Sequence, residues 1–309
     1  MQEATAGGRS LWSDAWRRIR RDKAAMACLG IIIFYALLAI GAATYEALAG
    51  SPDMPKYEMM YEYGRRHTPP SLQSWDLLLG TDWEGTSVLV KTIYGAKVSL
   101  TVGLMANIIA IPLGMMLGAI AGFYGRKTDM LIVWLYSTLA SIPGIIMLMA
   151  LKFAFKKVTI FGLDLGGIHG IYIALGIISW VGTCRYVRAE TMKIRELDYV
   201  MAARAAGRRS FSILLRHVLP NVFHIGIITF SLGIIGAVSA EVILSFLGLG
   251  VEVGTPSWGS MIDASRNELF AGHWWELASA VGAIFFLVLA LNIFGDRLRD
   301  ALDPRLKNV

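Results

Sequence analysis

One carboxylate stands out among the side chains that can take part in chemistry. Glu241 lies within an apolar run, and the segment "VILSFLGLG" continues that run beyond it. An ionisable side chain inside a membrane helix usually faces a cavity or pairs with a partner. Glu241 is therefore a candidate either to line a path through the protein or to hold two helices together near the outer surface.

The motifs of common catalytic sites are missing from the sequence. In "GFYGRKTD", Arg126 separates Gly125 from Lys127, so the phosphate loop of many ATP-binding proteins is not formed. Neither H-E-x-x-H nor G-x-S-x-G occurs, and the five histidines are scattered. Cys28 and Cys184 fall at different levels of the expected membrane, which argues against a disulfide or a metal pair. We therefore expect no catalytic residue, metal or cofactor in this chain.

Composition places the chain in a membrane. Apolar residues make up 55% of the 309, and charged residues make up only 17%, below the quarter or so usual in soluble domains. Long stretches carry no charge at all, and six of them approach or exceed the roughly 20 residues that a bilayer requires. These runs are Ala24 to Tyr45, Val98 to Gly125, Met130 to Leu151, Leu165 to Cys184, Val218 to Ala240 and Leu277 to Gly295. We predict an all-α polytopic membrane protein with six transmembrane helices.

The basic residues predict the orientation of these helices. When the segments between them are assigned alternately to two sides, one side receives twenty of the 29 Lys and Arg residues. The positive-inside rule makes that side cytoplasmic, so we expect both termini in the cytoplasm. The expected chain begins with a basic cytoplasmic segment 1–23, a first transmembrane helix and signal anchor 24–48, and an extracytoplasmic loop 49–97. A transmembrane core 98–297 and a cytoplasmic tail 298–309 follow. Within the core we expect a cytoplasmic loop 185–220 and an outer loop 248–275.

The stretch "YVMAARAAGRRSFSILLRHVLPN", from Tyr199 to Asn221, separates two apolar runs on the cytoplasmic side. Its alanines have high helix propensity and little bulk, and Gly207 is a natural helix C-cap. We predict two short helical pieces divided by Gly207, with Pro220 closing the second. A helix of this kind can lie very close to another protein, or its arginines can simply enforce topology and grip anionic lipid.

The same stretch resembles the cytoplasmic loop of bacterial ATP-binding-cassette import permeases, whose consensus reads E-A-A, three residues, G, then a stretch ending I-x-L-P. "MAARAAG" and "HVLPN" match it, with Met201 in place of the glutamate. Three more stretches are similar to the dipeptide and oligopeptide branch: "LGTDWEGTSVLVKTIYGAKVSL" (Leu79 to Leu100), "ILSFLGLGVEVGTPSWGSMI" (Ile243 to Ile262) and "NIFGDRLRDALDPRL" (Asn292 to Leu306). Thr86, Ser87 and Lys91 replace the branch's usual Arg, Asp and Arg, so we expect its outer salt-bridge network to be altered or lost.

The resemblance implies a type I importer permease fold in the bacterial cytoplasmic (inner) membrane. It implies as partners a homologous second permease chain, an extracytoplasmic substrate-binding protein and two cytoplasmic ATP-binding-cassette subunits that hold ATP and Mg, with no nucleic acid. A coupling helix would dock on the ATPase through Met201, Ala202, Ala203, Arg204, Ala205, Ala206, Gly207, Arg208 and Pro220. The binding protein would contact Asp82, Trp83 and Trp258. The implied cargo is a short peptide, although the branch also carries nickel chelates, glycosides and related solutes.

Two alternatives remain open at this point. Gly114, Gly118 and Gly122 recur every four residues, which indicates either close helix packing or a gap that substrate passes through. The alternative function is a proton-coupled secondary transporter, with Glu241 as the proton-carrying carboxylate and no nucleotide-binding partner.

Overall fold

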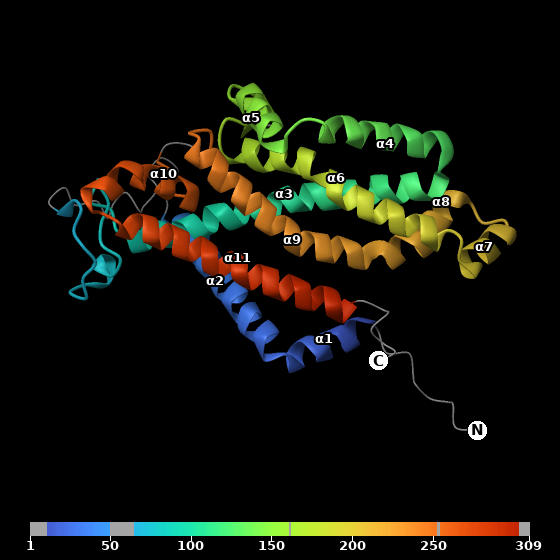
Figure 1. The fold of residues 1–309 in the computed structure, drawn as a ribbon, viewed down its shortest axis with the longest axis horizontal. Coiled ribbons are helices and arrows are strands. Elements are labelled where there is room, and N and C mark those ends of the chain that lie inside the picture. Colours follow the sequence, from blue (N-terminus) through green and yellow to red (C-terminus); the bar gives the residue numbers. More distant parts are fainter. Residues whose placement is uncertain (1–10, 50–64, 161, 252–253, 303–309) are drawn as a thin grey trace.

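The computed structural model describes residues 11–49, 65–160, 162–251 and 254–302, which form an elongated bundle of helices (Figure 1). The helices are α1 (Leu11–Arg21), α2 (Lys23–Ala49), α3 (Val88–Tyr124), α4 (Arg126–Ala140), α5 (Gly144–Phe155), α6 (Ile168–Ile194), α7 (Asp198–Ala205), α8 (Ser210–Ile213), α9 (Leu219–Phe246), α10 (Trp258–Glu268) and α11 (Trp275–Leu302). Two-residue strands β1 (Thr159–Ile160) and β2 (Leu163–Asp164) pair antiparallel. Short 3-10 helices lie at η3 (Trp75–Leu77) and η5 (Leu269–Ala271), and η4 (Leu214–Val218) is a π-helix. The predicted all-α class is confirmed.

Five helical stretches in the described part of the chain are long and apolar enough to cross a membrane. They are α2, α3, α6, the stretch Ser210–Phe246 that contains α9, and α11. A sixth span arises only if α4 and α5 are counted together, and this pair bends by 87°. Five of the six expected spans are thus continuous helices, whereas the third, expected from Met130 to Leu151, is the bent pair α4 and α5. Pro143 stands at the start of α5, where its ring and missing N–H prevent a helix from continuing.

The long helix α3 packs along α6 through the three glycines spaced four residues apart. A Cβ atom at Gly114, Gly118 or Gly122 would lie 2.5–2.7 Å from a backbone carbonyl oxygen of α6. Only glycine permits so close an approach of two backbones, and dispersion contacts between them stabilise helix pairs in lipid. These residues therefore form a packed seam and not a gap.

The two ends of the bundle are built differently. Helices α7 and α8 lie at one end, while α10 and residues 65–87 lie at the opposite end (Figure 1). Helix α11 runs beside α2 from the α10 end toward the α7 end, and α1 packs against it. Of the expected extracytoplasmic loop, residues 50–64 lie outside the described residues, as do Arg9, Arg305 and Lys307 of the basic side. Helix α3 begins at Val88, earlier than the expected boundary at residue 98.

Candidate functional site

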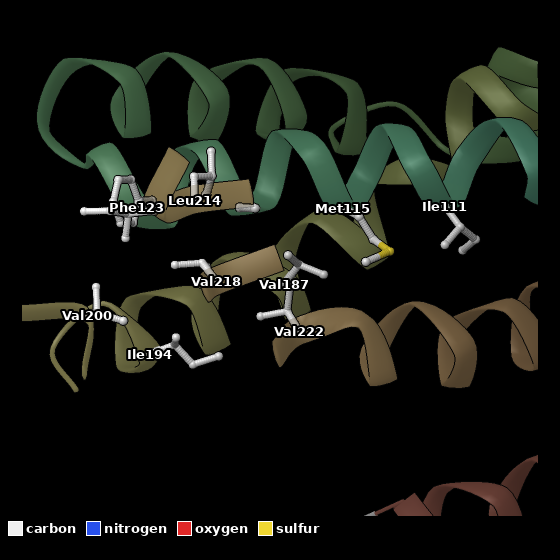
Figure 2. Close-up of a cluster of buried hydrophobic side chains, with 11 residues drawn as sticks. Ile111, Met115, Phe123, Val187, Ile194, Val200, Leu214, Val218 and Val222 are labelled. Atoms are coloured by element: carbon white, nitrogen blue, oxygen red, sulfur yellow. The ribbon is translucent and has the colours of Figure 1, made fainter. Parts of the chain in front are cut away.

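Helix α7, the expected coupling helix, is anchored to the bundle by one apolar face. Val200 is fully buried, and Ala203 packs beside it against the same cluster of side chains. Figure 2 shows this cluster, which draws on α3, α6, α7, α8, η4 and α9. Its members are Ile111, Met115, Ala119, Phe123, Val187, Ile194, Val200, Ile213, Leu214, Val218 and Val222. A helix of eight residues is too short to be stable alone, so this packing is what holds it.

The end of α7 is a complete Schellman cap, as the glycine in this stretch predicts. The Arg208 N–H donates to the Ala203 carbonyl at 3.2 Å, and the Gly207 N–H donates to the Arg204 carbonyl at 3.0 Å. Gly207 has a φ of +76°, the left-handed conformation that favours glycine. The two predicted helical pieces are therefore present as α7 and α8, and Gly207 sets the turn between them.

The other face of α7 is open to the surroundings. Met201 is 46% exposed, and the exposed set continues through Ala202, Arg204, Ala205, Ala206, Gly207 and Arg208. The Arg204 guanidinium lies 5.7 Å from the centre of the Phe123 ring, which orients this side chain along the end of the bundle. Pro220, which was expected to close the second piece, instead lies exposed in the first turn of α9. Proline fits there because its missing N–H needs no partner in the first turn of a helix.

Asn221 and Tyr199 join α7 to α9, and neither was among the expected site residues. The Asn221 amide nitrogen donates to the His217 carbonyl at 2.6 Å and to the Tyr199 hydroxyl at 3.1 Å. Burial raises the pKa of the Tyr199 phenol, so this group stays a neutral hydroxyl. The contact ties the start of α7 to the start of the long helix that crosses the bundle.

Two further contacts between helices at the α7 end of the bundle were not predicted from the sequence. Arg188 of α6 forms a bidentate ion pair with Asp129 of α4, in which the Arg188 Nη2 atom lies 2.6 Å from the Asp129 Oδ2 atom. Arg195 donates to the Gly122 carbonyl of α3 at 2.9 Å. Because these partners are far apart in the chain, no local pattern could have revealed them. Together they fix α3, α4 and α6 where α7 begins.

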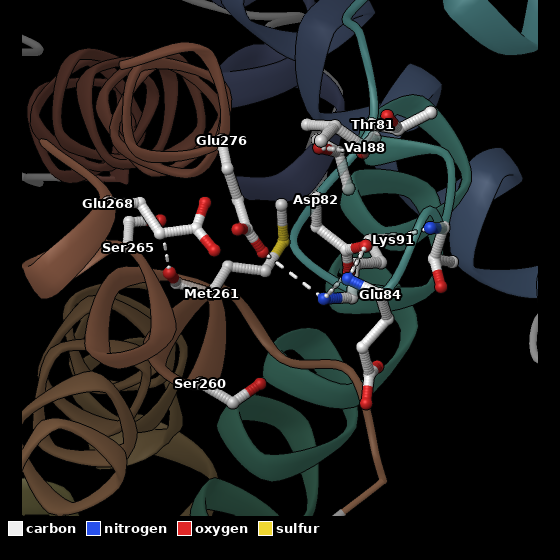
Figure 3. Close-up of polar contacts among 12 residues, drawn as sticks. Thr81, Asp82, Glu84, Val88, Lys91, Ser260, Met261, Ser265, Glu268 and Glu276 are labelled. Carbon is white, nitrogen blue, oxygen red and sulfur yellow. Dashed lines mark hydrogen bonds and ion pairs between the residues drawn. The ribbon is translucent and has the colours of Figure 1, made fainter. Parts of the chain in front are cut away.

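At the opposite end, Asp82 and Lys91 form the centre of an ion network (Figure 3). The Lys91 ammonium pairs with Asp82 and lies 3.2 Å from a carboxylate oxygen of Glu276 in α11. The same Asp82 accepts the backbone N–H groups of Glu84 and Thr86 at 2.9 and 2.7 Å. Of the two outcomes expected for the outer salt-bridge network, altered or lost, the loss is excluded, because Lys91 reaches two carboxylates.

Of the three residues expected to contact a binding protein, only one has a side chain exposed on the surface. Trp83 is 48% exposed, whereas Asp82 and Trp258 are fully buried. The Trp258 indole N–H donates to the Thr92 carbonyl at 3.0 Å, and the ring fills the space that a side chain at Gly95 would need. The expectation is corrected for Asp82 and Trp258, which hold the outer end together from inside.

Glu241 lies where α9 meets α3 and is fully buried. One carboxylate oxygen accepts the Ser99 hydroxyl at 3.0 Å, and the other accepts the Ser245 hydroxyl at 2.8 Å. Both oxygens are thus used in contacts between and within helices. Of the two roles considered for Glu241, this conformation favours the interhelical contact, because the carboxylate does not line an opening.

Known protein families match the chain over most of its length. A family model described as "Binding-protein-dependent transport system inner membrane component" matches residues 114–308. The chain belongs to this family. A second model, for the N-terminal transmembrane domain of oligopeptide transport permease C, matches residues 10–70 of the permease.

Relatives resemble the permease from end to end. It is 34% identical to the dipeptide transport system permease protein DppC of Bacillus subtilis, over 96% of this chain and 87% of the relative. It is 35% identical to the oligopeptide transport system permease protein OppC of Haemophilus influenzae, over 99% of this chain and 92% of the relative. A solved structure of the inward-facing MetNI methionine ABC transporter matches it with a TM-score of 0.51 at 18% identity, covering 70% of the permease and 96% of that chain.

These similarities establish the general nature of the protein. It is a multi-pass permease of the bacterial inner membrane with the importer permease fold, and permease subunits of this family are non-catalytic. Proteins of this family work in general with ATPase and binding-protein partners. The dipeptide and oligopeptide branch suggested by the sequence motifs is confirmed.

Proposed function

We propose that the permease is the transmembrane subunit of an ATP-driven importer of short peptides, and that α7 transmits the motion of a cytoplasmic ATPase to the bundle. The observation that carries this proposal is the construction of α7. One face is anchored on buried Val200, the end is closed by the cap at Gly207, and the remaining face is exposed. Because α7 packs against the long helices of the bundle, a displacement of α7 by a partner protein would displace those helices as well.

The exposed face has the chemistry to dock on another protein. Its alanines allow close backbone approach, and Arg204 and Arg208 can make charge-assisted hydrogen bonds to carboxylates of the partner. The anchor cluster beneath includes side chains of α3, α6 and α9, which are three of the long membrane helices. Displacement of α7 therefore acts directly on the helices that cross the membrane. No residue of this chain is assigned to ATP, which we place with Mg on two partner ATPase subunits.

A second, homologous permease chain is part of the proposal. The exposed faces of α3 and α9 border an apolar hollow of about 460 Å³, with Ile108, Met116 and Phe223 among its lining residues. A hollow between two membrane helices can face either lipid or a partner chain, and alternating access requires two halves that move against each other. We place the second chain on this face, and an extracytoplasmic binding protein at the end that carries Trp83.

The proposed cargo follows from the relatives. The proteins of Bacillus subtilis and Haemophilus influenzae are a dipeptide and an oligopeptide transport permease, and both align with nearly all of this chain. Nothing favours a proton-coupled transporter, because Glu241 is fully buried and both of its oxygens accept serine hydroxyls.

The test is ATP hydrolysis by the purified complex in lipid, with and without its binding protein. A tryptophan in place of Gly207 would project into open space, since no atom lies within 4 Å of a Cβ there. We expect Gly207→Trp to abolish stimulation by the binding protein while the chain still assembles. Lys127→Trp, at an exposed position in the first turn of α4, is the matched control and should keep the stimulation.

Two results would refute the proposal. One is stimulated hydrolysis in Gly207→Trp at the native level. The other is the absence of any copurifying ATPase together with peptide uptake that follows a proton gradient.

A further inference from the structure

Three side chains with metal-binding chemistry meet at the outer end of the bundle. His67 comes from the loop before η3, Glu268 from the end of α10 and His273 from the turn before α11. One possible ligand atom from each residue lies within 4.8 Å of the other two. The ion network of Asp82 and Lys91 lies nearby and does not include any of the three residues.

The spacing is close to that of a metal site. The His67 Nδ1 atom lies 3.6 Å from a carboxylate oxygen of Glu268. The imidazole rings of His67 and His273 stack with their centres 4.0 Å apart and their planes 12° from parallel, so one ring must turn about its side-chain bonds before both nitrogens can bind the same ion. Zinc binds nitrogen and oxygen ligands at about 2.0–2.2 Å in tetrahedral geometry, which puts neighbouring ligand atoms about 3.3–3.6 Å apart. The distance between His67 and Glu268 already falls at the end of that range.

The polar atoms at this point lack partners. The Nδ1 atoms of His67 and His273 and one carboxylate oxygen of Glu268 are buried and make no hydrogen bond within the described part of the chain. Buried polar atoms of native proteins are nearly always satisfied by protein, water or an ion, so three such atoms that converge on one point form a place where a ligand can bind. A divalent cation would satisfy all three at once, whereas a hydrogen bond would satisfy two at most.

The surroundings add a reason for a cation. The Glu268 side chain is only 10% exposed, and its carboxylate oxygen lies 3.6 Å from the His67 Nδ1 atom, beyond hydrogen-bond distance. An ionised carboxylate without a hydrogen-bonded partner is costly in such a place, and a bound cation removes that cost.

The main chain holds both histidines in position. The His67 N–H donates to the Asp82 carbonyl at 3.0 Å, and the His273 N–H donates to the Glu268 carbonyl at 3.0 Å. His67 has a φ of +51°, a left-handed conformation that is uncommon outside glycine. The surrounding structure thus keeps the ring of His67 beside Glu268 despite a local backbone cost.

We propose that His67, Glu268 and His273 form a binding site for zinc or a similar divalent cation on the extracytoplasmic side of the permease. Two imidazoles and one carboxylate provide three ligands, and water would complete the tetrahedron. The ion clamps together the outer loop, α10 and the start of α11. The outer loop and α11 are also joined by the Trp275 indole N–H, which donates to the Thr81 carbonyl, and by the Lys91 network. The expectation of a chain without metal arose because His67 is far in the sequence from Glu268 and His273.

The experiment measures zinc on the purified full-length chain in lipid nanodiscs. After treatment with EDTA, the native chain is incubated with zinc chloride, desalted and analysed by mass spectrometry for bound metal. Cobalt chloride is added to a second sample, because tetrahedral cobalt has a strong visible absorption band. The thermal unfolding midpoint is recorded with and without zinc. Glu268→Gln and His273→Ala remove one ligand each, and His169→Ala is the control, since His169 contacts Tyr172 instead.

We expect about one zinc per native chain, a tetrahedral cobalt band and a higher unfolding midpoint with zinc, all of them kept in His169→Ala. Loss of a second-shell partner costs about 10–100-fold in metal affinity, so the two ligand variants should lose at least that much. Glu268→Gln keeps the size of the side chain, and an unchanged midpoint without zinc will show that it folds. The proposal is overturned if the native chain binds no zinc, or if all variants bind zinc equally.

Discussion

The Lys91 ammonium lies 3.2 Å from a carboxylate oxygen of Glu276, a residue 185 positions further along the chain. The same ammonium pairs with Asp82, and the side chains of both acidic residues are completely buried. One cation thus serves two buried carboxylates and joins the outer loop, α3 and α11. Lys91 is therefore an ionic link between three segments of the outer end.

Removal of the Lys91 ammonium group should destabilise the permease strongly. Lys91→Met leaves two buried carboxylates without their partner, and breaking a buried ion pair costs about 3–5 kcal/mol. We expect a much lower unfolding midpoint of the purified protein, measured by its tryptophan fluorescence. Lys193→Met is the control, because Lys193 pairs with Glu190 at the surface, and such a pair contributes about 1 kcal/mol or less. Equal midpoints for the two variants would contradict the role given to Lys91.

The glycine seam between α3 and α6 should not accept even a methyl group. At Gly118, a Cβ atom would lie 2.5 Å from the Cys184 carbonyl oxygen, so Gly118→Ala must push the helices apart. We expect a loss of about 1–3 kcal/mol, typical of overpacking, seen as a lower unfolding midpoint. Gly182→Ala on α6 has no atom within 4 Å of the new Cβ and should be neutral or slightly stabilising. If Gly118→Ala is as stable as Gly182→Ala, the seam is looser than described.

The cap of α7 should discriminate between side chains according to their tolerance of positive φ. Gly207 has a φ of +76° and open space around it, so strain and not collision decides the outcome. The left-handed conformation costs about 1–2 kcal/mol for most residues, and asparagine adopts it more readily. We expect ATPase stimulation by the binding protein to fall more in Gly207→Val than in Gly207→Asn. The same rank order should appear in protease sensitivity of the α7 segment, and a reversed order would contradict the cap.

Glu241 should prove structural and not proton-carrying. Glu241→Gln keeps an acceptor for one serine hydroxyl, and losing one buried hydrogen bond partner costs about 1–3 kcal/mol. We expect a lower unfolding midpoint together with peptide uptake into proteoliposomes that persists without a pH gradient. Uptake that requires a proton gradient in the native protein and disappears in Glu241→Gln would contradict this prediction.

Much of the architecture was predictable because it depends on local composition. Long charge-free runs must become helices in a bilayer, where each backbone group needs an internal partner. The spacing of alanines before Gly207 likewise predicts a short helix with a C-cap, and the structure contains both. The bend between α4 and α5 was missed, although Pro143 was visible, because the apolar run continues across the proline and was treated as one span.

Other features depended on contacts between distant residues. Trp258 looks like a surface aromatic in the sequence, yet it is buried against α3 because Gly95 leaves room for its ring. His67 and His273 look like isolated histidines, and only the folded outer end brings them to Glu268.

The difference between the features predicted from the sequence and those seen only in the structure has a physical basis. Hydrophobic length, helix propensity and capping act over a few residues. The sequence alone therefore determined five continuous membrane spans, the short capped helix before Gly207 and the family. Burial, ion pairing and ligand geometry act through space between segments far apart in the chain. Only the tertiary structure could decide which face of α7 is open, which carboxylates share Lys91 and where three metal-binding side chains meet.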